Sequence, residues 1–132
     1  MTRILITGGA GYLGAVLVPK ILAWGHEVIV LDSFRHGVPS LTACCSNPRF
    51  TLIRGDARDQ HTLAQLMPKV DAIIPLAAIV GGPACDRDQS AAVTTNLNAI
   101  KMLCLKASHD QLIIYPNTNS GYGVGGEDEC TE

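Results

Sequence analysis

The chain has 132 residues, of which 47% are hydrophobic and 17% charged, and its formal net charge is -2. This length is enough for one compact domain with its own core and too short for two domains of ordinary size. The near balance of acidic and basic residues excludes the strongly basic surface typical of nucleic-acid-binding proteins. The hydrophobic content and the 13 glycines indicate a well-buried, tightly turned fold rather than a disordered or fibrous chain.

The cysteines and the apolar segments limit the possible cellular compartments and the possible binding partners. The chain has five cysteines, an odd number, and no two of them have the C-x-x-C spacing. We therefore expect no metal site, and we favour reduced thiols in a cytoplasmic protein over a disulfide framework. No apolar run approaches the roughly 20 residues of a membrane span, so we expect no membrane partner. Glycines interrupt the apolar run after Arg3, which argues against a signal peptide.

The N-terminal quarter of the chain predicts one β-α-β unit. Residues 3–7 predict a short strand, because residues 4–6 form a continuous apolar run that suits a parallel strand covered on both faces. A glycine-rich turn follows, and apolar residues at helical spacing predict a helix over about 12–24 that ends at Gly25. Residues 27–31 predict a second strand, which ends at Asp32.

The middle of the chain continues the alternation of strands and helices. The expected elements are a loop over 33–48 with at most a short helix, a strand over 50–54, a helix over 61–67 and a strand over 72–76. Asp59 is placed to cap the helix and Pro68 to stop it. Pro75 is expected at the end of its strand, because a proline cannot donate a hydrogen bond within a sheet.

The last elements complete the prediction of the fold class. We expect a loop at residues 81–83, a long helix over 88–107 with most of its apolar residues on one side, and a fifth strand over 111–115. Five strands that alternate with helices predict an α/β fold, a doubly wound parallel sheet of the Rossmann type with helices on both faces in three αβα layers.

The turn after the first strand has the spacing of a dinucleotide-binding motif. Gly9-x-Gly11-x-x-Gly14 fits it, and so does Gly8-x-x-Gly11-x-x-Gly14. Glycine permits positive φ in a tight turn, lets the backbone approach a pyrophosphate, and lets helix and strand pack closely. The free N–H groups at the helix N-terminus would then face the pyrophosphate.

Asp32 is the acidic partner that this motif requires. It stands 18 residues after Gly14, at the end of the second strand, where a carboxylate can accept hydrogen bonds from a ribose diol. The alternative is a structural glycine turn with a capping aspartate. A carboxylate repels a 2′-phosphate, so Asp32 favours NAD over NADP, although the guanidinium of nearby Arg35 could bind that phosphate.

The run T-G-G-A-G-Y-L-G, residues 7–14, resembles the signature of the extended short-chain dehydrogenases/reductases, the NAD-dependent epimerase/dehydratase family. The resemblance covers essentially the whole chain and implies that residues 1–132 form a dinucleotide-binding domain. It places the cofactor on residues of the turn and of the second strand's end: Gly8, Gly11, Tyr12, Leu13, Gly14, Asp32, Ser33 and Arg35.

Two further segments resemble cofactor-contacting segments of the family. G-D-A-R-D, residues 55–59, implies that Asp56 binds the adenine amine and that the backbone of Ala57 contacts the ring; a turn or capping role is the alternative for Asp56. Leu76, Ala77 and Ala78 resemble an apolar L-A-A segment that lines the cofactor. Asn96 matches a helix asparagine that supports the site, and a buried structural asparagine is an equally good interpretation.

Residues 115–123, Y-P-N-T-N-S-G-Y-G, resemble the segment after the family's fifth strand. The alignment from Gly123 places Thr118 at the catalytic Ser/Thr position, with Ser120 as the nearby alternative. A hydroxyl at the C-terminal end of a strand faces the crevice where such sheets bind ligands. An ordinary turn rich in Asn, Ser and Gly is the competing interpretation.

The sequence departs from the family at its catalytic base. The family uses Y-x-x-x-K, but Val16, Asn119 and Gly126 stand four residues after the three tyrosines, Tyr12, Tyr115 and Tyr122. We therefore expect the N-terminal portion of a longer enzyme, inactive alone, without the family's C-terminal strands and substrate domain.

The resemblance implies an epimerase or dehydratase that acts on a nucleotide-linked sugar by transient hydride transfer to NAD. The alternatives are a non-catalytic NAD(P)-binding sensor module and an NAD(P)H-dependent reductase of the same fold. By analogy with the family, we expect a homodimer with the helix over 88–107 as one contact face.

Overall fold

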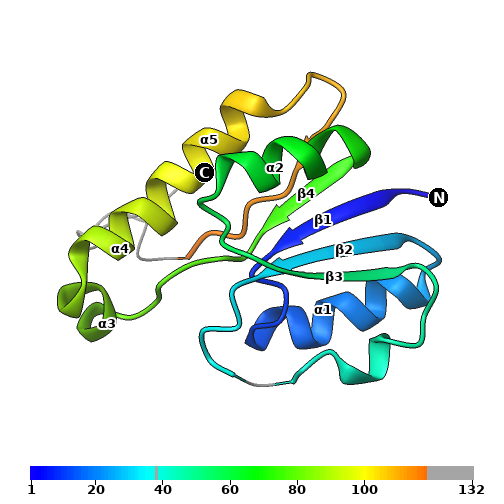
Figure 1. Cartoon of the computed structure of the whole chain (residues 1–132), viewed down its shortest axis with the longest axis horizontal. Helices are drawn as coiled ribbons and strands as arrows, with labels where there is room; N and C mark the ends of the chain where they lie inside the picture. The colour runs from blue at the N-terminus through cyan, green and yellow to red at the C-terminus, as the bar shows by residue number, and fades with distance from the viewer. Residues whose placement is uncertain (38, 119–132) are drawn as a thin grey trace, which may run out of the picture.

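The structure is a computed structural model that describes residues 1–37 and 39–118 (Figure 1). One sheet of five parallel strands forms its centre, in the spatial order β3-β2-β1-β4-β5. The strands are β1 (Arg3–Thr7), β2 (Glu27–Asp32), β3 (Phe50–Arg54), β4 (Ala72–Pro75) and β5 (Leu112–Ile113). The order reverses direction between β1 and β4, which makes the sheet doubly wound, and sheets of this kind bind ligands at the carboxyl ends of the strands where the order reverses.

Helices cover both faces of the sheet and give the predicted three layers. Figure 1 shows α1 (Tyr12–Ala23) on one face, and α2 (Gln60–Leu66) and α5 (Ala99–Lys106) on the other. The remaining helical segments are η1 (Thr42–Cys44), η2 (Met67–Lys69), α3 (Gly82–Arg87), α4 (Gln89–Val93) and η3 (Thr94–Asn98). The predicted α/β class and the Rossmann-type arrangement are therefore confirmed.

The two faces of the sheet bury two separate hydrophobic clusters. Ile4 and Ile6 of β1 belong to the cluster under α1, whereas Leu5 between them belongs to the cluster under α2 and α5. Successive side chains of a strand point to opposite faces, so a central strand needs an apolar residue at every position. This requirement explains the uninterrupted Ile-Leu-Ile run at the start of the sequence.

Three local predictions about helix and strand ends are confirmed. Gly25 follows α1 with φ of +89°, and its N–H donates to the carbonyl of Leu22 at 3.0 Å. Asp59 caps α2 by accepting from the N–H of His61 at 3.0 Å. Pro75 is the last residue of β4.

The segment from residue 81 to 107 differs from the prediction. The expected loop at 81–83 holds the start of α3, with Pro83 in its first turn, where the missing N–H has no intrahelical partner to lose. The expected long helix divides into α4, the π-helical η3 and α5. Its apolar residues do not share one buried side, since Leu103 is buried whereas Val93 and Leu97 are exposed.

The fifth strand is shorter than the predicted 111–115 because two prolines stop the ladder. The N–H of Leu112 and that of Ile114 donate to the carbonyls of Asp71 and Ile73, so alternate residues of the β4 segment face β5. The next two hydrogen bonds would run from the N–H of residue 75 to the carbonyl of Ile114 and from the N–H of residue 116 to the carbonyl of residue 75. Neither can form, because Pro75 and Pro116 both lack an N–H. The same alternation turns the missing N–H of Pro75 away from β1, which is why β4 accepts a proline in a central strand.

The helix predicted over 61–67 begins and ends one residue earlier, as α2 (Gln60–Leu66). Pro68 lies within the 3₁₀ segment η2 rather than directly stopping the α-helix. A proline near the start of a short helical segment is tolerated because its N–H position has no acceptor there. Among residues 33–37 and 39–48 the only helical segment is the short η1, as predicted.

Candidate dinucleotide-binding site

Four loops meet along the carboxyl edge of the sheet. The N–H of Leu76 after β4 donates to the carbonyl of Thr7 at 2.8 Å, and the N–H of Gly8 after β1 donates to the carbonyl of Leu31 at 2.8 Å. The N–H of Gly55 after β3 donates to the carbonyl of Asp32 at 2.9 Å. These bonds extend the sheet ladder by one residue and bring the segments singled out in the sequence onto one edge.

Two glycines of the turn are required by space. Gly8 has φ of +72°, and a Cβ there would lie 2.5 Å from the backbone nitrogen of Ala77. A Cβ on Gly14 would lie 2.0 Å from the carbonyl oxygen of Gly9. The loops after β1 and β4 and the start of α1 therefore approach one another as closely as bare backbone allows, which is the close packing that the glycine spacing predicts.

The first turn of α1 presents N–H groups without acceptors. The first hydrogen bond at this end runs from the N–H of Ala15 to the carbonyl of Gly11 at 3.0 Å. Within residues 1–37 and 39–118 no acceptor faces the N–H of Tyr12, Leu13 or Gly14. Gly11 caps the helix without a side chain, and the first turn has no acidic residue. The positive end of the helix dipole is thus open to an anion.

Asp32 lies beside this turn. Its Oδ2 accepts from the N–H of Ala10 at 2.9 Å, and its Oδ1 accepts from the N–H of Phe34 at 2.7 Å. An ionised carboxylate offers about four lone-pair positions, so about two remain for the hydroxyls of a ribose diol. Ser33 and Arg35 lie exposed on the same loop, and Phe34 between them has φ of +55°, unusual for a residue with a side chain.

Ser40 belongs to this neighbourhood and was missed in the sequence. Its Oγ donates to the carbonyl of Ala10 at 2.7 Å, which fixes the outer side of the glycine turn from a residue 30 positions away. The sequence offered only a serine in a Pro-Ser turn as a signal. The contact depends on how the loop after β2 folds back over the turn.

Asp56, after β3, is fixed by Arg58. The N–H of Arg58 donates to Oδ1 of Asp56 at 2.8 Å, and its Nη2 donates to Oδ2 at 2.6 Å. Hydrogen bonds from this guanidinium hold the pKa of the Asp56 carboxyl below its usual range. Ala57 is buried between them. Arg58 was not singled out in the sequence, although its spacing of two from Asp56 lets the side chain fold back onto the carboxylate.

The loop after β4 is held by Asn96. The side-chain Oδ1 of Asn96 accepts from the N–H of Ile79, and its Nδ2 donates to the carbonyl of Ile79, both at 2.8 Å. Ala77 and Ala78 precede Ile79 in this loop. The side chain of Asn96 therefore holds the backbone of the loop after β4, and these two bonds leave little of its amide for a ligand.

Thr118 lies beyond β5 on the chain that leaves the same edge of the sheet. Its side chain is exposed, and its N–H donates to Oδ1 of Asn117 at 2.8 Å. Ser120 and Tyr122, named above with it, lie outside the described residues.

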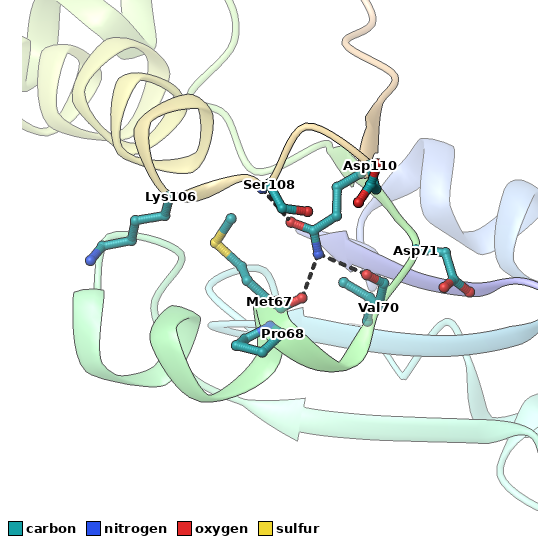
Figure 2. Close-up of a pocket in the computed structure, with 8 residues that line it drawn as sticks. Met67, Pro68, Val70, Asp71, Lys106, Ser108 and Asp110 are labelled. Atoms are coloured by element: carbon teal, nitrogen blue, oxygen red, sulfur yellow. Dashed lines mark hydrogen bonds between the residues drawn. The ribbon is translucent and has the colours of Figure 1, made fainter.

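A hollow of about 390 Å³ lies at the opposite edge of the sheet, where β4 and β5 begin. Figure 2 shows Ser108 and Asp110 across this hollow from Met67 and Val70. The amide of Gln111 there donates to the carbonyls of Met67 at 2.6 Å and Val70 at 2.7 Å. The polar groups that line the hollow thus hold neighbouring segments together, and the hollow is remote from the glycine turn.

Three findings concern other kinds of site. Among residues 1–37 and 39–118, no three His, Cys, Asp or Glu side chains are grouped so as to hold a metal ion. The four cysteines in those ranges, Cys44, Cys45, Cys85 and Cys104, are free thiols. No helix in the same part of the chain has both the length and the apolarity to cross a bilayer.

Comparison with known proteins identifies the family. The profile of the NAD dependent epimerase/dehydratase family matches residues 4–132. This chain belongs to that family. Family membership agrees with the resemblance carried by the glycine turn.

Two curated members of the NAD dependent epimerase/dehydratase family show the extent of the similarity. UDP-glucuronic acid decarboxylase 1 of Arabidopsis thaliana is 34% identical over 123 residues, 92% of this chain and 27% of that protein. UDP-glucose 4-epimerase of Lacticaseibacillus casei is 31% identical over 129 residues, 91% of this chain and 36% of that protein.

A solved structure has the same fold. The enzyme WbmG of Bordetella bronchiseptica, in complex with NAD and UDP, superposes with a TM-score of 0.74 and 28% identity, over 86% of this chain and 37% of that chain. This chain thus spans about a third of the length of the relatives it matches.

Proposed function

We propose that this chain binds NAD at the carboxyl edge of its sheet, as the dinucleotide-binding part of an enzyme that acts on a nucleotide-linked sugar. The hydrogen bond from the N–H of Ala10 to Asp32 carries the proposal. It sets an anion-binding helix end and a ribose-binding carboxylate side by side, which is the pair of groups that the diphosphate and ribose of NAD need.

Each candidate residue has a role that suits its place. The N–H groups of the first turn of α1 would bind the diphosphate, Asp32 the adenosine ribose and Asp56 the base. The remaining candidates would line or hold these subsites: Gly8, Gly11, Tyr12, Leu13, Gly14, Ser33, Arg35, Ala57, Leu76, Ala77, Ala78 and Asn96. The close approach of backbone at Gly8 and Gly14 fits a bound diphosphate, because a side chain at either position would displace the loops that form the cradle.

We propose NAD rather than NADP as the cofactor. Two main-chain N–H groups hold the carboxylate of Asp32 in place. Its negative charge would therefore repel the 2′-phosphate of NADP. Arg35 is the nearby cation that could favour NADP; it is exposed, so solvent weakens its attraction.

The proposed reaction belongs to the whole enzyme. NAD supplies a reversible hydride acceptor, and the protein supplies orientation and hydrogen bonds. The hydroxyl of Thr118 would hydrogen-bond the reacting oxygen of the sugar and stabilise the charge that develops there. The sequence has no lysine four residues after any tyrosine, so we propose that these residues bind the cofactor without turnover by themselves.

The test is calorimetric titration of the 132-residue chain with NAD. We expect saturable binding, and we expect Asp32→Ala to weaken it at least about tenfold through loss of charge-assisted hydrogen bonds. Asp110→Ala is the matched control, because Asp110 is an exposed aspartate at the opposite edge of the sheet. Equal effects of the two substitutions would refute the ribose assignment.

A second candidate is a module of the same fold that binds NAD without catalysis, because one fold can serve more than one function. The two candidates differ in the whole protein, not in this chain. Incubation of the longer protein with UDP-sugars and NAD, followed by chromatography of the sugar products, separates them. A product formed at a catalytic rate supports the enzyme, and binding without product supports the module.

The partners and the compartment complete the proposal. The exposed Val93 and Leu97 lie one helical turn apart on the α4–α5 segment and suit a homodimer contact. Sedimentation of the whole protein as a monomer at micromolar concentration would contradict this. The free thiols suit a reducing compartment, and we propose the cytoplasm.

A further inference from the structure

Arg58 connects two parts of the molecule that are distant in sequence. Its Nε lies 3.0 Å from both carboxylate oxygens of Asp56, and its Nη2 lies 2.6 Å from Oδ2. Its Nη1 donates to Oγ1 of Thr94, 36 residues away, at 3.2 Å. All three guanidinium nitrogens are therefore engaged, although half of the side chain is solvent-accessible.

These contacts leave part of the Asp56 carboxylate able to accept a further hydrogen bond. The main-chain N–H, Nε and Nη2 of Arg58 supply three donors to a carboxylate with about four lone-pair positions. About one position remains, which matches a single N–H of an amino group. The neighbouring positive charge keeps the carboxylate ionised, so it accepts hydrogen bonds and donates none.

The contact with Thr94 ties this carboxylate to the helix on the same face of the sheet. Thr94 begins η3, and its hydroxyl donates to the carbonyl of Ser90 at 2.8 Å. Two residues later Asn96 holds the backbone of Ile79 in the loop after β4. One guanidinium thus joins the loop after β3 to the helix segment that supports the loop after β4.

We infer that Arg58 is a positioning residue that makes Asp56 selective for a nucleobase with an exocyclic amine over one with a carbonyl at the same place. This inference rests on the proposed function, since it concerns the base of the dinucleotide. An oriented anionic acceptor binds an amine and repels a carbonyl oxygen, and a site built to hydrogen-bond one group rejects an analogue that lacks it. Thr94 contributes by fixing the guanidinium from its other end.

The experiment compares NAD with deamino-NAD, in which hypoxanthine replaces adenine. Calorimetric titration of the 132-residue wild-type chain should give at least about tenfold tighter binding of NAD. Arg58→Met keeps much of the side-chain length and the main-chain N–H but removes the charge and every side-chain donor, and should reduce the preference to within about threefold. Arg58→Lys keeps the charge but lacks the planar set of guanidinium N–H donors. It should give an intermediate ratio of the NAD and deamino-NAD affinities.

The ratio of the two affinities separates positioning from general effects. A lost attraction between Arg58 and the diphosphate would weaken both dinucleotides equally and leave the ratio unchanged. Thr94→Val, close in size but without the acceptor, should lower the ratio by about twofold to fivefold. Arg87→Met, at an exposed arginine in the last turn of α3, is the control that should leave it unchanged.

The outcomes distinguish this inference from the proposed function. Binding of both dinucleotides with the wild-type ratio preserved in Arg58→Met overturns the role of Arg58 and leaves NAD binding intact. A reduced ratio in Arg58→Met with a wild-type ratio in Thr94→Val overturns only the part assigned to Thr94. Binding of neither dinucleotide by the wild-type chain overturns both proposals. Circular dichroism checks folding, and if Arg58→Met fails to fold, the ratios of Arg58→Lys and Thr94→Val decide.

Discussion

The main-chain N–H of Ala10 donates to Oδ2 of Asp32 at 2.9 Å, although 22 residues separate them. The acidic residue at the end of β2 is thereby part of the glycine turn after β1. The contact needs no particular side chain at position 10, because the donor is the main-chain N–H that the turn exposes. The same carboxylate accepts from Phe34 and so fixes the start of the next loop as well.

Asp32→Asn should destabilise the protein. The two carboxylate oxygens accept from two different N–H groups, and an amide would turn its NH₂ toward one of them. We expect a loss of about 1–3 kcal/mol in the free energy of unfolding, the cost of one unsatisfied partly buried donor. Urea denaturation measures it, with Asp110→Asn as the exposed control. An unchanged unfolding midpoint in Asp32→Asn would show that the two hydrogen bonds do not stabilise the turn.

Gly8→Ala and Gly25→Ala separate backbone strain from crowding. Both glycines have positive φ, which costs an alanine about 1–2 kcal/mol. A Cβ at Gly25 meets open space, whereas a Cβ at Gly8 meets the backbone of Ala77 at 2.5 Å. We expect Gly8→Ala to cost about 1–3 kcal/mol more than Gly25→Ala. Thermal or urea unfolding of the two variants tests this, and equal losses would mean that the loop after β4 can move away.

Asn96→Asp should loosen the loop after β4. A carboxylate can still accept from the N–H of Ile79, but it loses the donor to the carbonyl of Ile79 and repels that oxygen. We expect about 1–3 kcal/mol of lost stability. The signal should be faster amide hydrogen exchange at residues 77–80. Asn98→Asp, at an exposed position of the same helical segment, is the control. If both variants exchange alike, Asn96 does not hold the loop.

The ion pair of Asp56 and Arg58 should contribute to stability only above acidic pH. The hydrogen bonds from Arg58 lower the pKa of the Asp56 carboxyl in the folded chain below the value of about 3.9 found in unfolded peptides. The contribution is therefore complete above about pH 5 and disappears as the pH falls below 4 through the folded pKa. Because both side chains are 44% exposed, solvent limits it to under about 1 kcal/mol.

Urea unfolding of wild type and Arg58→Met between pH 3 and pH 6 measures this contribution. The stability difference between the two proteins should be larger at pH 6 than at pH 3. A difference that stays constant over this range would show that the pair does not stabilise the folded chain.

Much of the fold could be predicted because its signals are local. The glycine turn, the apolar runs of β1 and β2 and the cap at Asp59 each depend on residues within a few positions. The short β5 could not be predicted from its own residues, since Gln-Leu-Ile-Ile-Tyr has the composition of a longer strand. Its end depends on Pro116 and on Pro75 in the neighbouring strand, and the effect of Pro75 appears only when the register is known.

The candidate site divides in the same way. Gly8, Gly14 and Asp32 could be found from spacing, because a β-α-β unit fixes how far apart its turn and its second strand end must lie. Ser40 and Thr94 could not be found, because each depends on a loop or helix that approaches from another part of the chain. Arg58 lay between the two cases, since its contact with Asp56 is local and its contact with Thr94 is not.

The sequence by itself determined the doubly wound sheet and the place of its glycine turn, because strand periodicity and the conformational freedom of glycine act over short stretches of chain. Only the tertiary structure decided what holds the site together. Asp32 bonds to Ala10, Arg58 spans from Asp56 to Thr94, and Asn96 fixes Ile79. These contacts join segments 17 to 36 residues apart, and hydrogen bonds depend on distance and angle in space.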